Sequence, residues 1–291
     1  MKICGKRITR QKKQRKETDM TREEKTDWLL QYLKAENAGY AAIPDPVNFT
    51  EKRKLLRSLM NVRRPGEASD EYYTVQDSLL TEEAEEKGIV DVRNLSSVAE
   101  EFPENELRNP EKIYLWKGDI TRLKCDAIVN AANSQLLGCF VPCHGCIDNA
   151  IHSAAGIQLR NECARIMAAQ GHEEPVGRAK ITEGYNLPAK HVIHTVGPVV
   201  GTMVLPQQKE ELKNCYINSL KLAEKHHLES IAFCCISTGE FHFPNKLAAK
   251  IAVENVDKYL TKSGIKQVIF NVFKEEDYRL YTKKFLGTGD F

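Results

Sequence analysis

The sequence predicts an α/β protein in which a helical N-terminal extension precedes a mostly parallel sheet with helices on both faces. Beyond residue 110, short apolar runs alternate with longer stretches of helical periodicity, which is the pattern of a parallel sheet. Before that point the periodicity is helical, with no alternating strands. A chain of 291 residues, 42% hydrophobic and 28% charged, has an ordinary globular composition and is long enough for one large domain or two modest ones.

Three helices are expected in the extension. Residues 21–37 form an amphipathic stretch in which Thr21 and Glu24 have the spacing of a capping box. Residues 50–62 predict a second helix, ended by an Arg-Pro-Gly run, and residues 70–86 predict a third. Apolar side chains share one face of the first helix: Trp28, Leu29, Tyr32 and Leu33.

Strands and helices alternate after a boundary marked by Pro103, Asn109 and Pro110. The expected strands are 113–116, 125–129, 191–195, 231–236 and 267–272. The expected helices are 147–170, 207–227, 244–262 and 274–285. The chain therefore divides into an arm (1–20), a helical extension (21–108) and an α/β domain (109–291).

Charge and cysteine usage narrow the class of protein. Residues 1–16 hold eight basic side chains and no acid, which predicts a solvated, disordered arm, with weak nucleic-acid contact or targeting as the alternative. The net charge of +2 argues neither for nor against an anionic ligand, and we do not expect a nucleic acid as the partner. The sequence has no apolar run long enough for a membrane span and no secretory signal, so we expect a cytoplasmic protein.

Nine scattered cysteines do not look like a disulfide framework, and clustered cysteines favour a role as metal ligands or catalytic groups.

Three loops follow expected strands, at the sheet edge where such proteins bind ligands. They are Gly118–Thr121, Asn130–Asn133 and Ser237–Pro244. In the first, Asp119 can accept a hydrogen bond from an adenine amine; in the second, the two asparagines can bond ribose hydroxyls. In the third, Gly239 permits close backbone approach, and the start of the next helix is a site for an anion. Taken singly, each loop also looks like an ordinary turn or helix cap.

A cluster of metal-ligating side chains lies next to the second loop. Cys139, Cys143, His144 and Cys146 fall within eight residues, and thiolate and imidazole are good zinc ligands. A catalytic zinc keeps one position open, so three ligands are expected, namely Cys139, His144 and Cys146. Cys143 is the excluded candidate, because neighbours in sequence point apart in most backbone conformations. Buried or incidental residues and a redox-active thiol pair are the alternatives.

Five motifs occur in the order typical of macrodomains: GDIT, DAIVNAAN, DNAIHSAAG, VIHTVGP and STGEFHFP. Over residues 109–286 the sequence resembles that family, which implies a three-layer α/β/α fold with ADP-ribose in a cleft across the strand ends. By the family pattern, Asp119 contacts the adenine, Ile120 lies under the adenine ring, and Asn133 faces the distal ribose. Phe241 or Phe243 is expected to pack against a ribose. The diphosphate is expected between two turns, formed by Ile147, Asp148 and Asn149 and by Ser237, Thr238, Gly239, Glu240 and Phe241.

The sequence departs from many macrodomains between its second and third motifs. A glycine-rich stretch is common there, whereas residues 137–149 contain the cysteines and the histidine. In this the chain resembles the zinc-dependent macrodomain subgroup, which also carries a helical N-terminal extension and is often linked to a dedicated sirtuin. The resemblance implies Zn²⁺ as cofactor and Asn133 and Asp148 as catalytic residues, with Asp148 orienting or deprotonating a water near the distal ribose.

Several of these residues also have a structural interpretation. Asp148 is also a candidate N-cap for the following helix. Glu240 is equally a solvated loop acid. His152 and His194 are expected to be structural, the first inside a helix and the second at a strand end.

The function expected from the sequence is zinc-dependent hydrolysis of mono-ADP-ribose from modified protein side chains, with an acidic-residue linkage. Zinc is expected near the scissile bond, where it binds the distal ribose or a water. The expected partners are ADP-ribose, a mono-ADP-ribosylated protein and a sirtuin-type ADP-ribosyltransferase. Two other functions stay open: an ADP-ribose reader with a structural zinc, and an O-acetyl-ADP-ribose deacetylase.

Overall fold

A six-stranded sheet with the order β2-β8-β7-β4-β6-β5 forms the centre of the computed structural model, which describes residues 20–288. Neighbouring strands are parallel except for β5, which runs antiparallel to β6. The sheet is therefore mixed and mostly parallel, as predicted. The predicted basic arm, residues 1–16, lies outside the described residues. The strands are β2 (Ile113–Lys117), β4 (Ala127–Ala132), β5 (Ala179–Glu183), β6 (His191–Val196), β7 (Ser230–Phe233) and β8 (Gln267–Val272).

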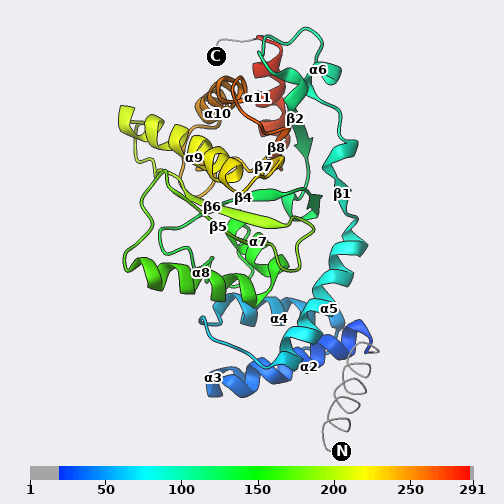
Figure 1. Cartoon of the computed structure of the whole chain (residues 1–291). Helices are drawn as coiled ribbons and strands as arrows, with labels where there is room; N and C mark the ends of the chain where they lie inside the picture. Colours follow the sequence, from blue (N-terminus) through cyan, green and yellow to red (C-terminus); the bar gives the residue numbers. More distant parts are fainter. Residues whose placement is uncertain (1–19, 289–291) are drawn as a thin grey trace, which may run out of the picture.

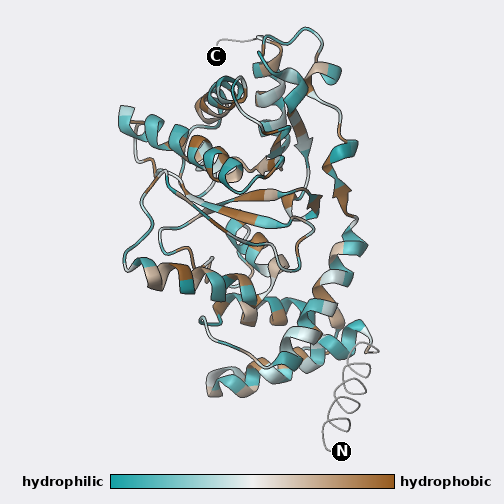
Figure 2. Cartoon of the chain, viewed as in Figure 1, coloured by the Kyte–Doolittle hydropathy of each residue, from teal (hydrophilic) through white to brown (hydrophobic). Residues whose placement is uncertain are grey.

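Helices cover both faces of this sheet, which confirms the three-layer architecture (Figure 1). On one face lie α9 (Pro206–Lys225), α10 (Asn245–Leu260) and α11 (Glu275–Phe285), and on the other lie α7 (Ile147–Ala155) and α8 (Ile157–Gln170). The inner strands β4, β6, β7 and β8 are buried on both sides, whereas the outward surfaces of the helices are largely hydrophilic (Figure 2). No helix in residues 20–288 combines the length and apolarity that a bilayer crossing needs.

The extension packs against the face of the domain that carries α7 and α8 (Figure 1). It consists of α2 (Arg22–Glu36), α3 (Ala38–Ala41), α4 (Phe49–Val62) and α5 (Asp70–Lys87). Its helices have a core of their own, built mainly from leucines, which also takes in Ile157 from the start of α8. Because one domain residue belongs to this core, the two parts bury apolar surface together.

A connecting segment leads from the extension to the first strand of the sheet. It contains β1 (Val90–Asp91), η1 (Val92–Asn94), α6 (Val98–Glu101) and η2 (Pro110–Lys112). A second short segment after β2 holds η3 (Ile120–Arg122) and β3 (Leu123–Lys124), and β3 pairs in parallel with β1. The predicted helical extension is thus confirmed, and the connecting segment after it adds one strand of two residues, β1.

The single helix expected over residues 147–170 is wrong, because the chain forms two helices that meet at Gly156. Gly156 has φ +94°, and a Cβ there would lie 2.6 Å from the Gln76 side-chain nitrogen. The side-chain oxygen of Gln76, Oε1, accepts a hydrogen bond from the first amide of α8, that of Ile157, at 3.0 Å. The break is therefore the point at which α5 of the extension caps a domain helix, a long-range contact that helical periodicity does not encode.

Two details of the sheet also differ from the sequence pattern. The edge strand β5 was not predicted; it has only one buried residue, Thr182, and so lacks an apolar run. Strand β4 continues through Ala132, so the expected loop at Asn130–Asn133 is mostly strand, with Asn130 fully buried.

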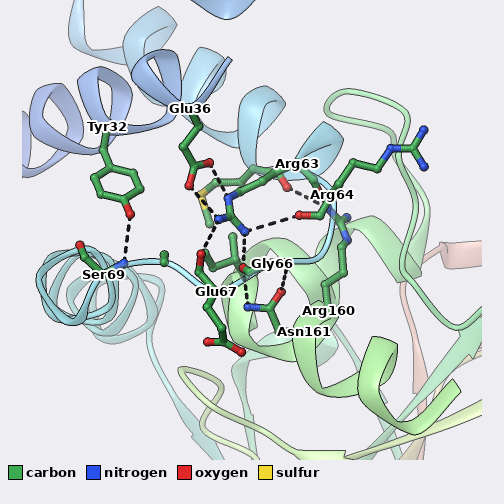
Figure 3. A network of polar contacts seen from close by, with 12 residues as sticks. Tyr32, Glu36, Arg63, Arg64, Gly66, Glu67, Ser69, Arg160 and Asn161 are labelled. Atoms are coloured by element: carbon green, nitrogen blue, oxygen red, sulfur yellow. Dashed lines mark hydrogen bonds and ion pairs between the residues drawn. The ribbon is translucent and has the colours of Figure 1, made fainter. Parts of the chain in front are cut away.

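A polar network joins the end of α4 to α8 (Figure 3). The Arg63 guanidinium donates to both carboxylate oxygens of Glu36, at 2.7 and 2.8 Å, and to the Gly66 carbonyl oxygen at 2.8 Å. From the domain, Arg160 donates to the carbonyl oxygens of Met60 at 3.0 Å and Arg63 at 2.7 Å. Asn161 bonds both backbone groups of Gly66, each at 3.0 Å. The network satisfies carbonyl groups at the end of α4, which have no partners within the helix.

We expect Arg160→Ala to lower the free energy of unfolding by about 1.5–3 kcal/mol, because it removes charged hydrogen bonds from buried carbonyl groups. The measurement is urea unfolding followed by circular dichroism. Arg165→Ala is the matched control: Arg165 also reaches the extension from α8, through Glu67, but both side chains are exposed, so the change should stay within about 0.5 kcal/mol. Equal stability of the two variants would contradict the role assigned to Arg160.

Candidate active site

A buried carboxylate, Asp148, lies in the first turn of α7 beside the end of β4. Its side chain accepts hydrogen bonds from Asn130 Nδ2 at 2.7 Å and from Asn133 Nδ2 at 3.4 Å. Burial raises the pKa of Asp148 to about 6, although the bond from Asn130 opposes the shift. The N-cap of α7 is Cys146, so the interpretation of Asp148 as the N-cap is wrong. The acid stays close to the helix N-terminus, where the helix dipole favours a negative charge.

The two asparagines at the end of β4 have different surroundings. Asn130 is fully buried, and its amide also lies 3.2 Å from His194 Nδ1, so it holds Asp148 from within the protein. Asn133 is half-buried and donates to the Gly138 carbonyl oxygen at 3.2 Å as well as to Asp148. Of the pair expected to bond ribose hydroxyls, only Asn133 keeps some exposure.

The three predicted metal ligands come together. The ligand atoms of Cys139, His144 and Cys146 all lie within 4.8 Å of one another, and all three side chains are half-buried. Cys139 Sγ is 3.6 Å from His144 Nδ1. Sulfur and nitrogen ligands of a tetrahedral zinc are about 3.6 Å apart when the metal–ligand bonds have their usual lengths. The donor set and its spacing therefore fit zinc.

Two features of the surroundings of this cluster bear on metal binding: the burial of a thiol and a nearby carboxylate. Burial raises the pKa of the Cys146 thiol to about 12, and the neighbouring thiol of Cys139 adds to the rise. Metal binding would lower the pKa of this thiol instead, because a metal ion binds the deprotonated thiolate. His144 Nε2 lies 3.7 Å from a carboxylate oxygen of Glu240, so Nδ1 is the ring nitrogen that faces the thiol. A carboxylate behind a ligating imidazole fixes its orientation.

Cys143 points to the opposite side of the loop, toward α4. Its Sγ lies 3.2 Å from Ser58 Oγ, and its backbone has φ +51°, a left-handed conformation. The structure thus places Cys143 outside the cluster. All eight cysteines in the described part of the chain are free.

A second group of metal-type side chains, His152, Cys163 and His194, is fully buried. Burial lowers the pKa of His194 to about 3, moves that of His152 well below its usual value and raises that of the Cys163 thiol. His194 already bonds Thr182 at 3.0 Å and contacts Cys163 at 3.7 Å. His194, Cys163 and Thr182 thus contact one another behind Asp148, whereas neither ring nitrogen of His152 has a hydrogen-bond partner among the described residues. The structural role expected for the two histidines stays a prediction.

The third loop, between β7 and α10, lies close enough to the metal-type cluster for Glu240 to reach His144. Ser237 has φ +65°, and its buried hydroxyl has no hydrogen-bond partner among the described residues. Thr238 and Phe241 are half-buried, whereas Gly239 and Glu240 are exposed. Phe243 belongs to the hydrophobic core, so of the two aromatic candidates only Phe241 is free to contact a ribose.

The first loop places Asp119 and Ile120 as a half-buried acid and a core residue. Asp119 Oδ1 caps η3 by accepting from the Thr121 amide at 3.0 Å and the Thr121 hydroxyl at 2.7 Å.

Asn149 of α7 is fully buried, and its side chain bonds Arg57 at 2.7 Å and the Val141 carbonyl oxygen at 2.9 Å. Half-buried Ile147 precedes Asp148 in the same turn. Ligand binding by these residues stays a prediction.

Sequence reasoning missed the side chains of the extension that reach the cysteine-containing loop. Arg57 and Asn61 are four residues apart on α4 and therefore share a face. Asn61 is 2% exposed, but its face of α4 also carries Lys54, Arg57 and Ser58, so the sequence pattern gave no sign that it is buried.

Comparisons with known proteins agree with this geometry. Residues 129–252 match the Macro domain family. A protein-ADP-ribose hydrolase from Treponema medium is 47% identical over 265 residues, which is 91% of this chain and 99% of the relative. One of the same name from Staphylococcus aureus (strain MSSA476) is 43% identical over 272 residues, 92% of this chain and 98% of the relative. The structure of a Trypanosoma brucei macrodomain in complex with ADP-ribose superimposes with a TM-score of 0.59 at 31% identity, covering 81% of this chain and 95% of that one.

We expect the purified protein to bind one Zn²⁺ per chain, measured by elemental analysis. Cys139→Ala, His144→Ala and Cys146→Ala should each lose the metal, because each removes one of three ligands. Cys143→Ala is the control and should keep it, since that thiol faces α4. Full zinc content in all three ligand variants would refute the assignment.

Proposed function

The chain belongs to the macro domain family, and we propose that it is a zinc-dependent hydrolase that removes mono-ADP-ribose from modified protein side chains. The observation that carries this proposal is the position of the Cys139–His144–Cys146 cluster on the loop that leads into the turn of Asp148. A metal-type cluster and a buried carboxylate at one edge of the sheet are the groups that a hydrolytic site needs. The protein-ADP-ribose hydrolase relatives, similar over more than nine-tenths of the chain, support the reaction class.

ADP-ribose is proposed to lie across the strand ends, as the family resemblance implies. Asp119 has its second carboxylate oxygen to offer the adenine amine, with Ile120 beneath the base. The Ser237–Phe241 loop and the turn at Ile147–Asn149 enclose the diphosphate. The unpartnered Ser237 hydroxyl supports this placement, because a buried hydroxyl without a partner is costly unless a ligand atom bonds it.

The distal ribose would then lie between Asn133 and the metal cluster. Asn133 bonds a ribose hydroxyl, and Asp148 holds and orients the water that attacks C1″ and accepts its proton. When bound by Cys139, His144 and Cys146, zinc lowers the pKa of a water or polarises the scissile bond. Asn130 keeps the carboxylate of Asp148 directed toward the site from behind.

The proposed linkage is to an acidic side chain. Hydrolysis releases the modified residue as leaving group, and a carboxylate leaves more readily than a neutral guanidine. A sirtuin-type ADP-ribosyltransferase as the source of the modification, and a cytoplasmic location, stay predictions.

We expect mild chelation to abolish hydrolysis while much of the ADP-ribose affinity is kept. Asp119 and the Ser237–Phe241 loop bind the ligand without the metal, whereas the reaction depends on it. The measurements are hydrolysis of a mono-ADP-ribosylated protein, hydrolysis of O-acetyl-ADP-ribose, and calorimetry with ADP-ribose, each before and after chelation. Circular dichroism confirms folding.

Two outcomes would overturn the proposal. Undiminished hydrolysis by verified metal-free protein would remove zinc from the reaction. Binding of ADP-ribose without turnover of either substrate by the zinc-loaded protein would identify a reader.

We expect Asp119→Ala to weaken ADP-ribose binding about ten- to hundredfold, because a hydrogen bond to a charged group contributes about 1.5–3 kcal/mol. Calorimetry on the folded variant measures it. Asp91→Ala is the control: Asp91 caps the one-turn helix η1 as Asp119 caps η3, but it lies on β1. Equal affinities of the two variants would remove Asp119 from the adenine site.

A further inference from the structure

The segment from Leu137 to Cys146, called here the metal loop, is held from behind by α4 of the extension. Its predicted ligand His144 lies near Glu240 of the third loop, while Cys143 and the backbone around it contact α4 and α7. Gly138 allows the loop to turn close to α7: it has φ +78°, and a Cβ there would lie 2.8 Å from the His152 ring. The loop therefore runs between the domain and the extension.

Asn61 bonds the backbone of the metal loop directly. Its Oδ1 accepts from the Cys143 amide at 2.9 Å, and its Nδ2 donates to Ser153 Oγ on α7 at 2.9 Å. Cys143 is the one non-glycine residue of the metal loop with a left-handed backbone, and the residue after it is the ligand His144. The amide of Asn61 thus stabilises an unfavourable backbone conformation immediately before a metal ligand.

Arg57 contacts the next part of the loop. Its guanidinium donates to Asn149 Oδ1 at 2.7 Å and to Ser153 Oγ at 3.2 Å, and it lies 3.5 Å from the His144 carbonyl oxygen. Asn149 in turn donates to the Val141 carbonyl oxygen at 2.9 Å. Arg57 therefore reaches the backbone on both sides of Cys143, directly or through one side chain.

Arg160 holds the start of the same loop. Its Nε donates to the Leu137 carbonyl oxygen at 2.7 Å, and its guanidinium stacks 4.3 Å from the centre of the Phe140 ring. The same guanidinium bonds the last carbonyl groups of α4 (Figure 3). The loop is thus tied to α4 at its beginning and at its centre.

We propose that Arg57 and Asn61 are positioning residues for the metal site, so that the N-terminal extension is a functional part of it. The inference rests on the proposed function for the identity of the metal, but concerns residues outside the domain that binds ADP-ribose. Outer groups that fix the ligands of a metal typically change its affinity 10–100-fold when removed. Arg57 acts on the backbone of His144 itself, and Asn61 acts on the backbone of the residue before it, Cys143, so the expected effect is of the same order.

The test measures metal binding rather than activity. The variants are Arg57→Ala, Arg57→Lys and Asn61→Ala in the full chain, loaded with Zn²⁺ or with Co²⁺ as a spectroscopic probe. Competition with a coloured chelator gives the zinc affinity, and the visible and thiolate-to-cobalt absorption bands report the geometry. We expect about 10–100-fold weaker zinc binding and an altered cobalt spectrum for both alanine variants, with partial recovery in Arg57→Lys, which keeps the charge.

Arg53→Ala is the matched control. Arg53 lies one turn before Arg57 on α4 and pairs with Glu83 of α5 at 2.5 and 2.7 Å, within the extension. Its loss should lower the melting temperature without changing zinc affinity or the cobalt spectrum. This comparison separates loop positioning from a general loosening of the extension, and if Asn61→Ala does not fold, the two arginine variants decide the question.

The outcomes distinguish this inference from the proposed function. If the wild-type protein binds zinc through Cys139, His144 and Cys146 but Arg57→Ala matches Arg53→Ala, the positioning role is wrong and the hydrolase proposal stands. If the wild-type protein binds no metal at these residues, both the zinc dependence and this inference fail.

Discussion

The arrangement of this protein depends on one buried guanidinium, that of Arg160. It is 5% exposed and donates to carbonyl groups at the end of α4 and at the start of the metal loop, which are separated by more than seventy residues of chain. Burial lowers the pKa of Arg160 to about 10, so it remains a cation near neutral pH. A charge removed from water is tolerated only where several acceptors replace the lost hydration. The helical extension, the metal loop and α8 must therefore keep fixed relative positions.

The parallel sheet supplies the second constraint. The carboxyl ends of its parallel strands lie along one edge, so the loops that follow β2, β4 and β7 come from distant parts of the chain to the same edge of the sheet. The acid at the start of α7, Asp148, lies there beside Asn130 and His152, and its burial raises its pKa although the hydrogen bond from Asn130 opposes the shift. The cysteine-containing loop enters the same edge, and its histidine lies near Glu240 of the third loop. Polar groups that are ordinary singly become a candidate reaction site because the topology brings them together.

The architecture was largely predictable from the alternation of apolar runs, and the cysteine cluster from its composition. Spacing along the chain was sufficient for Cys139, His144 and Cys146, because a short loop can bring together only nearby side chains. Strand β5 could not be predicted, since an edge strand with one buried residue has no apolar pattern. The break at Gly156 and the contacts of Arg57 and Asn61 depend on partners about 80 to 90 residues away, which no local period records.

The contacts between α4 and the metal loop have a thermodynamic consequence for the whole chain. Coupling between two equilibria is reciprocal. If the docking of α4 onto the domain strengthens metal binding by the loop, then metal binding strengthens the docking of α4 by the same free energy. Fluctuations that separate α4 from the domain would then become rarer as metal becomes available. The α4 amides lie about 80 residues before the cysteines in sequence. Their hydrogen exchange would then slow as the metal concentration rises.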